Sequence, residues 1–182
     1  MIALDKNPPV VSPPGTCVSE LVGSWWVAHT RSRHEKALAC DLTSASIPYF
    51  LPMVEHTLVI RKRRFRGKLP LFPGYLFFVG NSDARYVAMA TSHVANIIPV
   101  ADQARLRQEL SQIQRALESP TGFDPFPYLR EGTHCRITAG PLQGVQGVVI
   151  QRGGITRLVL QIEMLGQAVA TEIDPSLLEP MD

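Results

Sequence analysis

One stretch of this chain, from Arg61 to Val79, limits more than any other what the chain can fold into. It reads RKRRFRGKLPLFPGYLFFV. Six of its first eight residues are basic: Arg61, Lys62, Arg63, Arg64, Arg66 and Lys68. Because an unpaired charge is costly to bury, these six side chains cannot be buried without paired partners. The mostly apolar run over residues 71–79 must instead be buried or form a binding face.

Around this stretch, the sequence up to residue 118 predicts alternating strands and helices. Apolar, β-prone runs predict strands over residues 25–30, 49–60, 71–79 and 95–100. Ser32 and Glu35 match a capping box, so a helix should follow them, and further helices are expected over residues 83–90 and 102–117. The basic run would be the tip of a hairpin, with Gly67 easing its turn. This order, βαββαβα, fits a split-βαβ, ferredoxin-like sandwich with helices on one face of a four-stranded sheet.

Two details of this domain bear on its surfaces. Trp25 and Trp26 are neighbours in a predicted strand, so only one of them can face the core. Arg33, His34 and Lys36 lie in the first turn of the first helix, where positive charge is unfavourable. These three bases are either a solvated helix face or an addition to a phosphate-facing surface.

The composition of the chain changes after residue 118. Ser119–Pro127 reads SPTGFDPFP, and its three prolines and one glycine predict a linker. Beyond it, short β-prone runs between glycines predict a small barrel. The fold class is therefore α+β, with four parts. These are a disordered Pro-rich tail over residues 1–22, a first domain over 23–118, a linker over 119–128 and a barrel domain over 129–182.

Charge and motif content narrow the classes of function. Residues 1–122 carry 14 Lys and Arg against 9 Asp and Glu, whereas residues 123–182 carry 4 against 7, so only the first part is suited to a polyanion. No apolar run is long enough for a membrane helix, and the N-terminus does not resemble a secretory signal. We therefore expect a cytoplasmic protein without a membrane contact.

The sequence also lacks the patterns of catalytic and metal sites. Its three cysteines are far apart and form neither a disulfide framework nor a metal-ligand spacing. The five histidines show no HExxH pairing, and neither a nucleophile elbow nor a dinucleotide fingerprint is present. We expect no catalytic residue, no metal and no cofactor.

Two motifs, in order along the chain, resemble a known family. Ile137–Val149 reads ITAGPLQGVQGVV, whose three glycines in a strand–turn–strand setting resemble the KOW motif. Trp25–Val27 together with Leu71–Phe78, which reads LFPGYLFF, resembles the N-terminal domain of the NusG transcription factors. The resemblance spans residues 24–182. Tyr49–Met53, followed by basic residues and then PLFP, is closer to the specialised RfaH-type members than to ordinary NusG.

This resemblance implies that the first domain binds the clamp helices of RNA polymerase through an aromatic-lined depression. The implied site residues are Trp25, Phe72, Pro73, Gly74 and Tyr75. The residues point to the same place, because a Pro-Gly pair should break the pleat and turn Phe72 and Tyr75 toward one surface. The alternative is that these rings belong to the core, which is the expectation for Phe77 and Phe78.

The resemblance also implies partners for the other two surfaces. The basic run Arg61–Lys68 is either a solvated hairpin tip or a contact with non-template DNA or acidic polymerase loops. In the barrel, Leu142, Val145 and Leu165 fall at predicted turns and would dock a small-subunit ribosomal protein or termination factor Rho, or else pack the barrel end. RfaH refolds its second domain into helices, and the glycines retained here oppose that change.

The expected function is a non-enzymatic, monomeric elongation or antitermination factor. Its first domain would bind RNA polymerase, and its KOW domain would recruit a ribosomal or termination partner on a tether. The alternative is a ribosome-associated or RNA-associated KOW protein whose first domain is a different α+β module.

Overall fold

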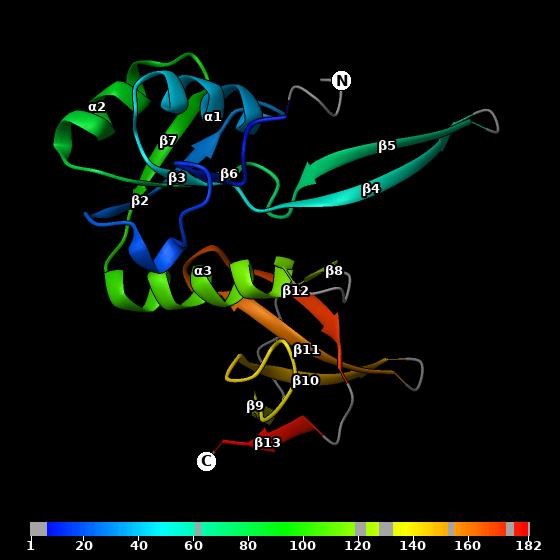
Figure 1. Cartoon of the computed structure of the whole chain (residues 1–182). Coiled ribbons are helices and arrows are strands. Elements are labelled where there is room, and N and C mark those ends of the chain that lie inside the picture. Colours follow the sequence, from blue (N-terminus) through cyan, green and yellow to red (C-terminus); the bar gives the residue numbers. More distant parts are fainter. Residues whose placement is uncertain are drawn as a thin grey trace. The chain divides into compact units, whose positions relative to one another are not determined.

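A computed structural model of the 182-residue chain describes residues 7–60, 63–118, 123–127, 133–152, 155–173 and 177–181. The chain divides into two compact units, Met1–Arg107 and Gln108–Asp182 (Figure 1). This division falls inside helix α3 (Gln103–Glu118) and not in the predicted linker over residues 119–128. In the described ranges, no helix is long and apolar enough to cross a membrane.

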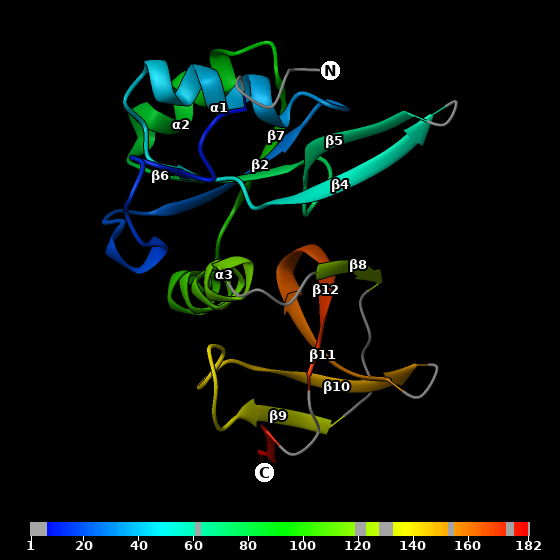
Figure 2. The same ribbon diagram turned by 45° about the vertical axis from the view of Figure 1, so that its right-hand side comes forward.

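The first unit is built on a five-stranded antiparallel sheet. Its strand order is β1 (Val11–Ser12), β3 (Tyr49–Phe50), β6 (Tyr75–Val79), β2 (Trp25–Thr30) and β7 (Val94–Pro99). Two helices, α1 (Glu35–Ser44) and α2 (Ser82–Ala90), lie on one face of this sheet (Figures 1 and 2). Strands β2 and β7 and helices α2 and α3 confirm the sequence-based elements to within one residue at each end.

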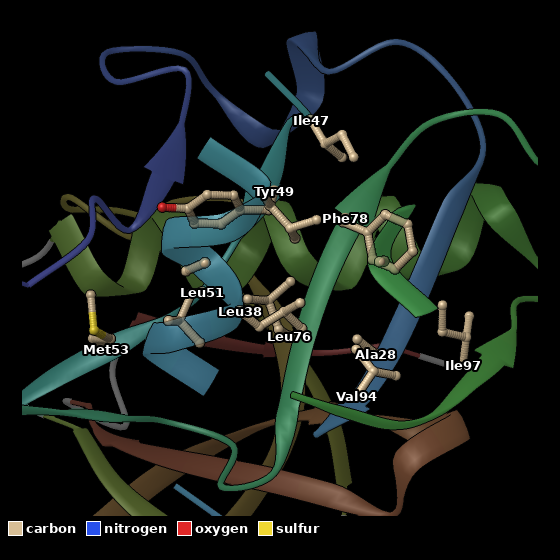
Figure 3. Close-up of a cluster of buried hydrophobic side chains, with 13 residues drawn as sticks. Ala28, Leu38, Ile47, Tyr49, Leu51, Met53, Leu76, Phe78, Val94 and Ile97 are labelled. Atoms are coloured by element: carbon tan, nitrogen blue, oxygen red, sulfur yellow. The ribbon is translucent and has the colours of Figure 1, made fainter. Parts of the chain in front are cut away.

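The core between the helices and the sheet follows from strand alternation. Ala28, Leu76 and Phe78 share the helix-facing side of the sheet, where they pack with the α1 residues Leu38 and Leu42. Figure 3 shows Leu38 next to Leu76 in this cluster. The residues between them in the strands occupy the other face of the sheet and are buried too: Trp25, Val27 and Phe77.

The strand predicted over residues 49–60 is divided by Leu51 and Pro52 into β3 and β4 (Met53–Ile60). Strand β4 pairs with β5 (Arg63–Pro70) as a separate two-stranded ribbon, which extends away from the five-stranded sheet (Figures 1 and 2). Gly67 was expected at the turn but lies within β5, opposite His56. The expected tip at residues 61–62 lies outside the described residues.

The strand predicted over residues 71–79 also begins later than expected. Residues 71–74 form a turn, and β6 starts only at Tyr75. Gly74 has a φ of +86°, a left-handed conformation that glycine adopts without the steric cost of a side chain. The Pro-Gly pair therefore ends the pleat, as the sequence indicated, and joins the ribbon to the sheet.

The predicted capping box at the start of α1 is wrong. The helix begins at Glu35, and its N-cap residue is His34, which makes no side-chain capping bond. Ser32 lies outside the helix, and the Glu35 carboxylate does not reach back to its own N-cap. Instead Glu35 accepts a hydrogen bond from the backbone amide of Gly74, which is distant in the sequence but adjacent in the fold.

The N-terminal segment differs from the disordered tail expected over residues 1–22. Strand β1 pairs with β3, with Val11 opposite Phe50. A short 3-10 helix, η2 (Val18–Glu20), follows, and Val18 and Leu21 are buried. These apolar side chains stabilise the segment despite its prolines, and the prolines are compatible with β1 because it is an edge strand.

The second unit contains a six-stranded antiparallel sheet. Its order is β13 (Leu178–Pro180), β9 (Thr133–Ile137), β10 (Gln146–Arg152), β11 (Ile155–Ile162), β12 (Gln167–Glu172) and β8 (Phe123–Pro127). A 3-10 helix, η3 (Glu163–Leu165), joins β11 to β12. Strands β9 to β12 confirm the predicted β-prone runs, but β8 occupies residues expected to be linker and pairs with β12.

Candidate functional site

The turn at residues 71–74 is held in place by backbone hydrogen bonds on both sides. Within it, the Tyr75 amide donates to the Phe72 carbonyl at 3.1 Å. The Thr30 amide at the end of β2 donates to the Gly74 carbonyl at 2.8 Å. At the other side, the Leu71 amide donates to the Pro52 carbonyl at 2.8 Å, which closes the base of the β4–β5 ribbon. The turn is therefore a defined structure and not a loose loop.

A buried carboxylate completes the turn. Glu35, in the first turn of α1, is only 6% exposed, and its Oε1 accepts a hydrogen bond from the Gly74 amide at 2.7 Å. A negative group is favourable at a helix N-terminus, and an amide bond to a charged acceptor is stronger than a neutral one. These two effects offset the cost of burying the carboxylate and fix the Gly74 backbone.

Next to the turn, two rings form an accessible aromatic platform. His29 of β2 lies opposite Tyr75 of β6, and their rings stack with centroids 5.2 Å apart and planes inclined by 26°. Tyr75 is half-buried, while His29 and Pro73 are exposed. A partner could therefore contact the Tyr75 ring, Pro73 and His29 on a surface whose backbone is already fixed.

The other two predicted aromatic site residues are buried. Trp25 is 2% exposed and Phe72 is 1% exposed. The expectation that Phe72 turns its ring outward is wrong in this structure. Its ring instead stands edge-on to Phe77 with centroids 6.1 Å apart, and Phe77 in turn lies 6.5 Å from Phe50. This aromatic row gains apolar burial, and its Phe72–Phe77 pair adds favourable edge-to-face geometry.

The predicted basic surface is described only in part. Arg63, Arg64 and Arg66 lie in β5, and Arg61 and Lys62 lie outside the described residues. Lys68 is half-buried near the base of the ribbon. The sequence pattern had placed the six bases at a hairpin tip. In the structure, most of them belong instead to strand β5.

The three bases at the start of α1 have different environments. Arg33 is exposed. The Nδ1 of His34 lies 2.8 Å from the Nδ1 of His93, whose Nε2 lies 3.4 Å from the Asp41 carboxylate. The Lys36 Nζ donates to the Lys68 carbonyl at 2.5 Å. The solvated-face alternative therefore fits Arg33, whereas the other two bases contact groups of the same unit.

Of the predicted site residues of the second unit, Leu142 lies in the turn before β10, Val145 directly follows that turn, and Leu165 ends the 3-10 helix η3. Leu142 and Val145 are buried, and Leu165 at the end of η3 is half-buried. The Val145 amide donates to the Leu142 carbonyl at 3.0 Å, and the Gly144 amide donates to the Ile137 carbonyl at 2.8 Å. The burial of their side chains favours the packing alternative for Leu142 and Val145, and Leu165 is the most accessible of the three.

Sequence reasoning missed the residues that support the site. Glu35 was assigned to a capping box, and His29 and Lys36 had no partner in any local pattern. Their contacts join positions far apart in the chain, such as Glu35 with Gly74. The only signal for His29 was its position in the strand after the two tryptophans, on the same face as Trp25.

Comparisons with known proteins identify a family for the first part of the chain. The family model described as "Transcription termination factor nusG" matches residues 23–115, about half of the chain. The chain belongs to the NusG family. The match contains β2, α1, the β4–β5 ribbon and the turn at residues 71–74.

No curated protein matches the chain. Among solved structures, one titled "Domain interaction in Thermotoga maritima NusG" is similar, with 19% sequence identity. That alignment covers 87% of this chain and 97% of the other, with a TM-score of 0.47.

Proposed function

We propose that this NusG-family protein is a non-enzymatic transcription elongation factor that binds RNA polymerase through its first unit. Family membership supports the class of function, because NusG-family members bind RNA polymerase. The observation that carries the proposal is the His29–Tyr75 ring pair beside a Gly74 turn fixed by the buried Glu35. A half-exposed ring on a rigid backbone can anchor a partner helix with little loss of conformational entropy.

The proposed polymerase-binding residues play two roles. Tyr75 and Pro73 would contact the clamp helices directly, and Gly74 would set the backbone between them. Trp25 and Phe72 would form the apolar base beneath this surface, since both side chains are buried. Binding would keep the clamp closed on DNA and disfavour pausing.

The β4–β5 ribbon would add an electrostatic contact. Positions 64, 66 and 68 fall on one face of the ribbon by strand alternation, opposite positions 59, 57 and 55. Arg64, Arg66 and Lys68 are the residues at the first three of these positions. Basic residues at these positions are suited to non-template DNA or to acidic polymerase loops, and the contact would weaken as salt rises.

We further propose an RfaH-like specialisation. The first unit would be a ferredoxin-like domain, and the second an SH3-like KOW barrel that recruits a small-subunit ribosomal protein or Rho at raised local concentration. Leu165 and the glycine-rich turn before β10 would provide that contact. The protein would act as a monomer in the cytoplasm. The resemblance of Tyr49–Met53 and PLFP to RfaH-type sequences supports this specialisation.

Elongation in vitro across a known pause or terminator tests the function. Wild-type protein should change the lifetime of the pause or the read-through fraction. Tyr75→Ala should remain folded and lose at least about tenfold in polymerase affinity, the loss typical of an aromatic anchor. Tyr86→Ala is the matched control, because Tyr86 is 76% exposed and belongs to α2 and not to the turn. Equal affinities for Tyr75→Ala and wild type would refute the proposed site.

Retention of RNA instead of polymerase by the wild-type chain would refute the proposed function itself. That result would favour the RNA-associated alternative. The acidic balance of residues 123–182 argues against it, because like charge opposes phosphate binding.

A further inference from the structure

The β4–β5 ribbon shares no strand pairing with the five-stranded sheet of the same unit. The hydrogen bond from the Leu71 amide to the Pro52 carbonyl joins the two ends of the ribbon to each other. It closes the ribbon's base but does not set the ribbon's direction relative to the sheet. An isolated two-stranded ribbon is marginally stable and free to twist, so contacts between its base and the rest of the unit, such as the burial of Met53 in the core, limit its direction.

The side chain of Lys36 makes such a contact. Its Nζ donates to the Lys68 carbonyl of β5 at 2.5 Å and to the Asn7 Oδ1 at 2.7 Å. Lys36 is half-buried, and burial lowers the pKa of its ammonium group, with the neighbouring Glu35 charge opposing the shift. A charged donor that is partly removed from water makes a strong hydrogen bond to a backbone carbonyl.

Glu35, the residue before Lys36, contacts the same stretch of chain further along, at Gly74. Glu35 accepts from the Gly74 amide at 2.7 Å, so consecutive residues of α1 hold the chain at Lys68 and at Gly74. Glu35 accepts from a backbone N–H, and Lys36 donates to a backbone carbonyl. The helix itself is anchored, because Leu38 and Leu42 are fully buried in the core.

We propose that Lys36 and Glu35 are positioning residues that present the β4–β5 ribbon and the turn at residues 71–74 to one partner in a fixed mutual orientation. The fixed orientation of the ribbon and the turn is a property of this chain alone. Its effect on affinity rests on the proposed binding of RNA polymerase. Lys36 sets the direction of the ribbon, and Glu35 sets the conformation of the turn.

Backbone relaxation and residual dipolar couplings of the full chain test this fixed orientation. Lys36→Met keeps the length of the side chain and removes the donor. In this variant, the order parameters of the backbone amides in β4 and β5 should fall from about 0.85 toward 0.6. Amides of β2 and β6 should keep their wild-type values, and the Tm should change little. Lys36→Arg, which retains donors, should restore the wild-type couplings.

Lys68→Met is the matched control, because it removes one base of the ribbon and leaves the carbonyl at position 68 in place. It should leave the ribbon order parameters unchanged. Wild-type ribbon dynamics in Lys36→Met, or a Lys36→Arg variant as mobile as Lys36→Met, would overturn the proposal. A general loss of order that includes β2 would also overturn it, since it would show a purely structural role.

Polymerase affinity then separates the two proposals. Lys36→Met should bind the polymerase several-fold more weakly than wild type, and Lys36→Arg should recover most of that loss. If wild type itself does not bind, the proposed function fails, while the relaxation data still decide the positioning role. If Lys36→Met has a mobile ribbon and wild-type affinity, the positioning of the ribbon for a partner is refuted.

Discussion

Tyr49 belongs to the core cluster of the first unit and brings a hydroxyl group into it. Its side chain is fully buried, and its hydroxyl accepts a hydrogen bond from the Thr43 hydroxyl at 3.3 Å. Burial raises the pKa of Tyr49 above its ordinary value of 10.0, the Thr43 hydrogen bond lowers it, and the nearby Cys40 raises it further. The net direction is upward, so the folded chain retains the phenol proton more strongly than the unfolded chain.

This shift predicts a loss of stability at alkaline pH. The contribution of Tyr49 is fully present below pH 10.0 and is lost as pH rises through the higher pKa of the folded state. Tyr49→Phe should remove this part of the alkaline loss. Denaturant unfolding at a series of pH values, together with an ultraviolet titration of tyrosinate, measures it. A late tyrosinate step that persists in Tyr49→Phe would contradict the assignment.

Single residues also show how far sequence reasoning reached. The aromatic turn was found because Pro73 and Gly74 interrupt an apolar run, and the backbone there does leave the pleat. The orientation of the rings was not found. Phe72 and Tyr75 lie on either side of the same turn, yet the first packs edge-on to Phe77 and the second stacks on His29. Which ring is buried depends on neighbours from other strands, and a single sequence does not reveal them.

At the scale of elements, strands β10 and β11 approach each other closely at Gly147. A Cβ atom at this position would lie 2.4 Å from the Val159 carbonyl oxygen and 3.1 Å from the Leu158 Cγ. The first contact is with backbone, which cannot move without disturbing the β10–β11 pairing. The motif therefore requires glycine here for close approach of the two strands.

Gly147→Ala should accordingly destabilise the second unit. Overpacking of this kind costs about 1–3 kcal/mol, which corresponds to a Tm lower by roughly 5 °C or more for a unit of this size. Gly67→Ala is the control, because a Cβ there would meet nothing within 4 Å. Thermal unfolding followed by circular dichroism measures both variants. A Gly147→Ala protein as stable as Gly67→Ala would show that the two strands lie further apart.

Periodic elements were the most predictable part of the fold. Helix α3 was predicted to within one residue at each end, and Leu106, Leu110 and Ile113, which are spaced four and three residues apart, are buried along one helical stripe. The start of α1 was less predictable. Its Ser32–Glu35 pattern fits a local capping box, but the carboxylate contacts the Gly74 amide instead. Local patterns predict such a bond only when no distant donor competes for the same acceptor.

For the whole molecule, the two Pro-rich segments were the least predictable. Residues 1–22 and 119–128 were assigned to a tail and a linker from their proline content. Each contains an edge strand, β1 and β8, which are outermost in their sheets. An edge strand needs fewer backbone donors, so proline is compatible with it. Composition alone cannot distinguish such a strand from an unstructured segment.

The location of β8 leads to a prediction about where the second unit begins. Strand β8 pairs with β12 from Phe123 opposite Thr171 to Pro127 opposite Gln167. Earlier in the chain, the Gln112 Oε1 in α3 accepts a hydrogen bond from the Gln146 amide at 2.9 Å, within the same unit. A fragment of residues 129–182, which follows the boundary predicted from sequence, loses both contacts and leaves β12 as an unpaired edge.

A fragment of residues 103–182, which retains α3 and β8, should therefore have a higher Tm and a sharper unfolding transition than residues 129–182. Each lost buried backbone hydrogen bond costs about 1 kcal/mol, so removal of a strand pairing should be measurable even in a small unit. Thermal unfolding and amide exchange of β12 in the two fragments check this. Equal stability and equal protection of β12 would mean that α3 and β8 are dispensable, and the boundary at residue 129 would then be the correct one.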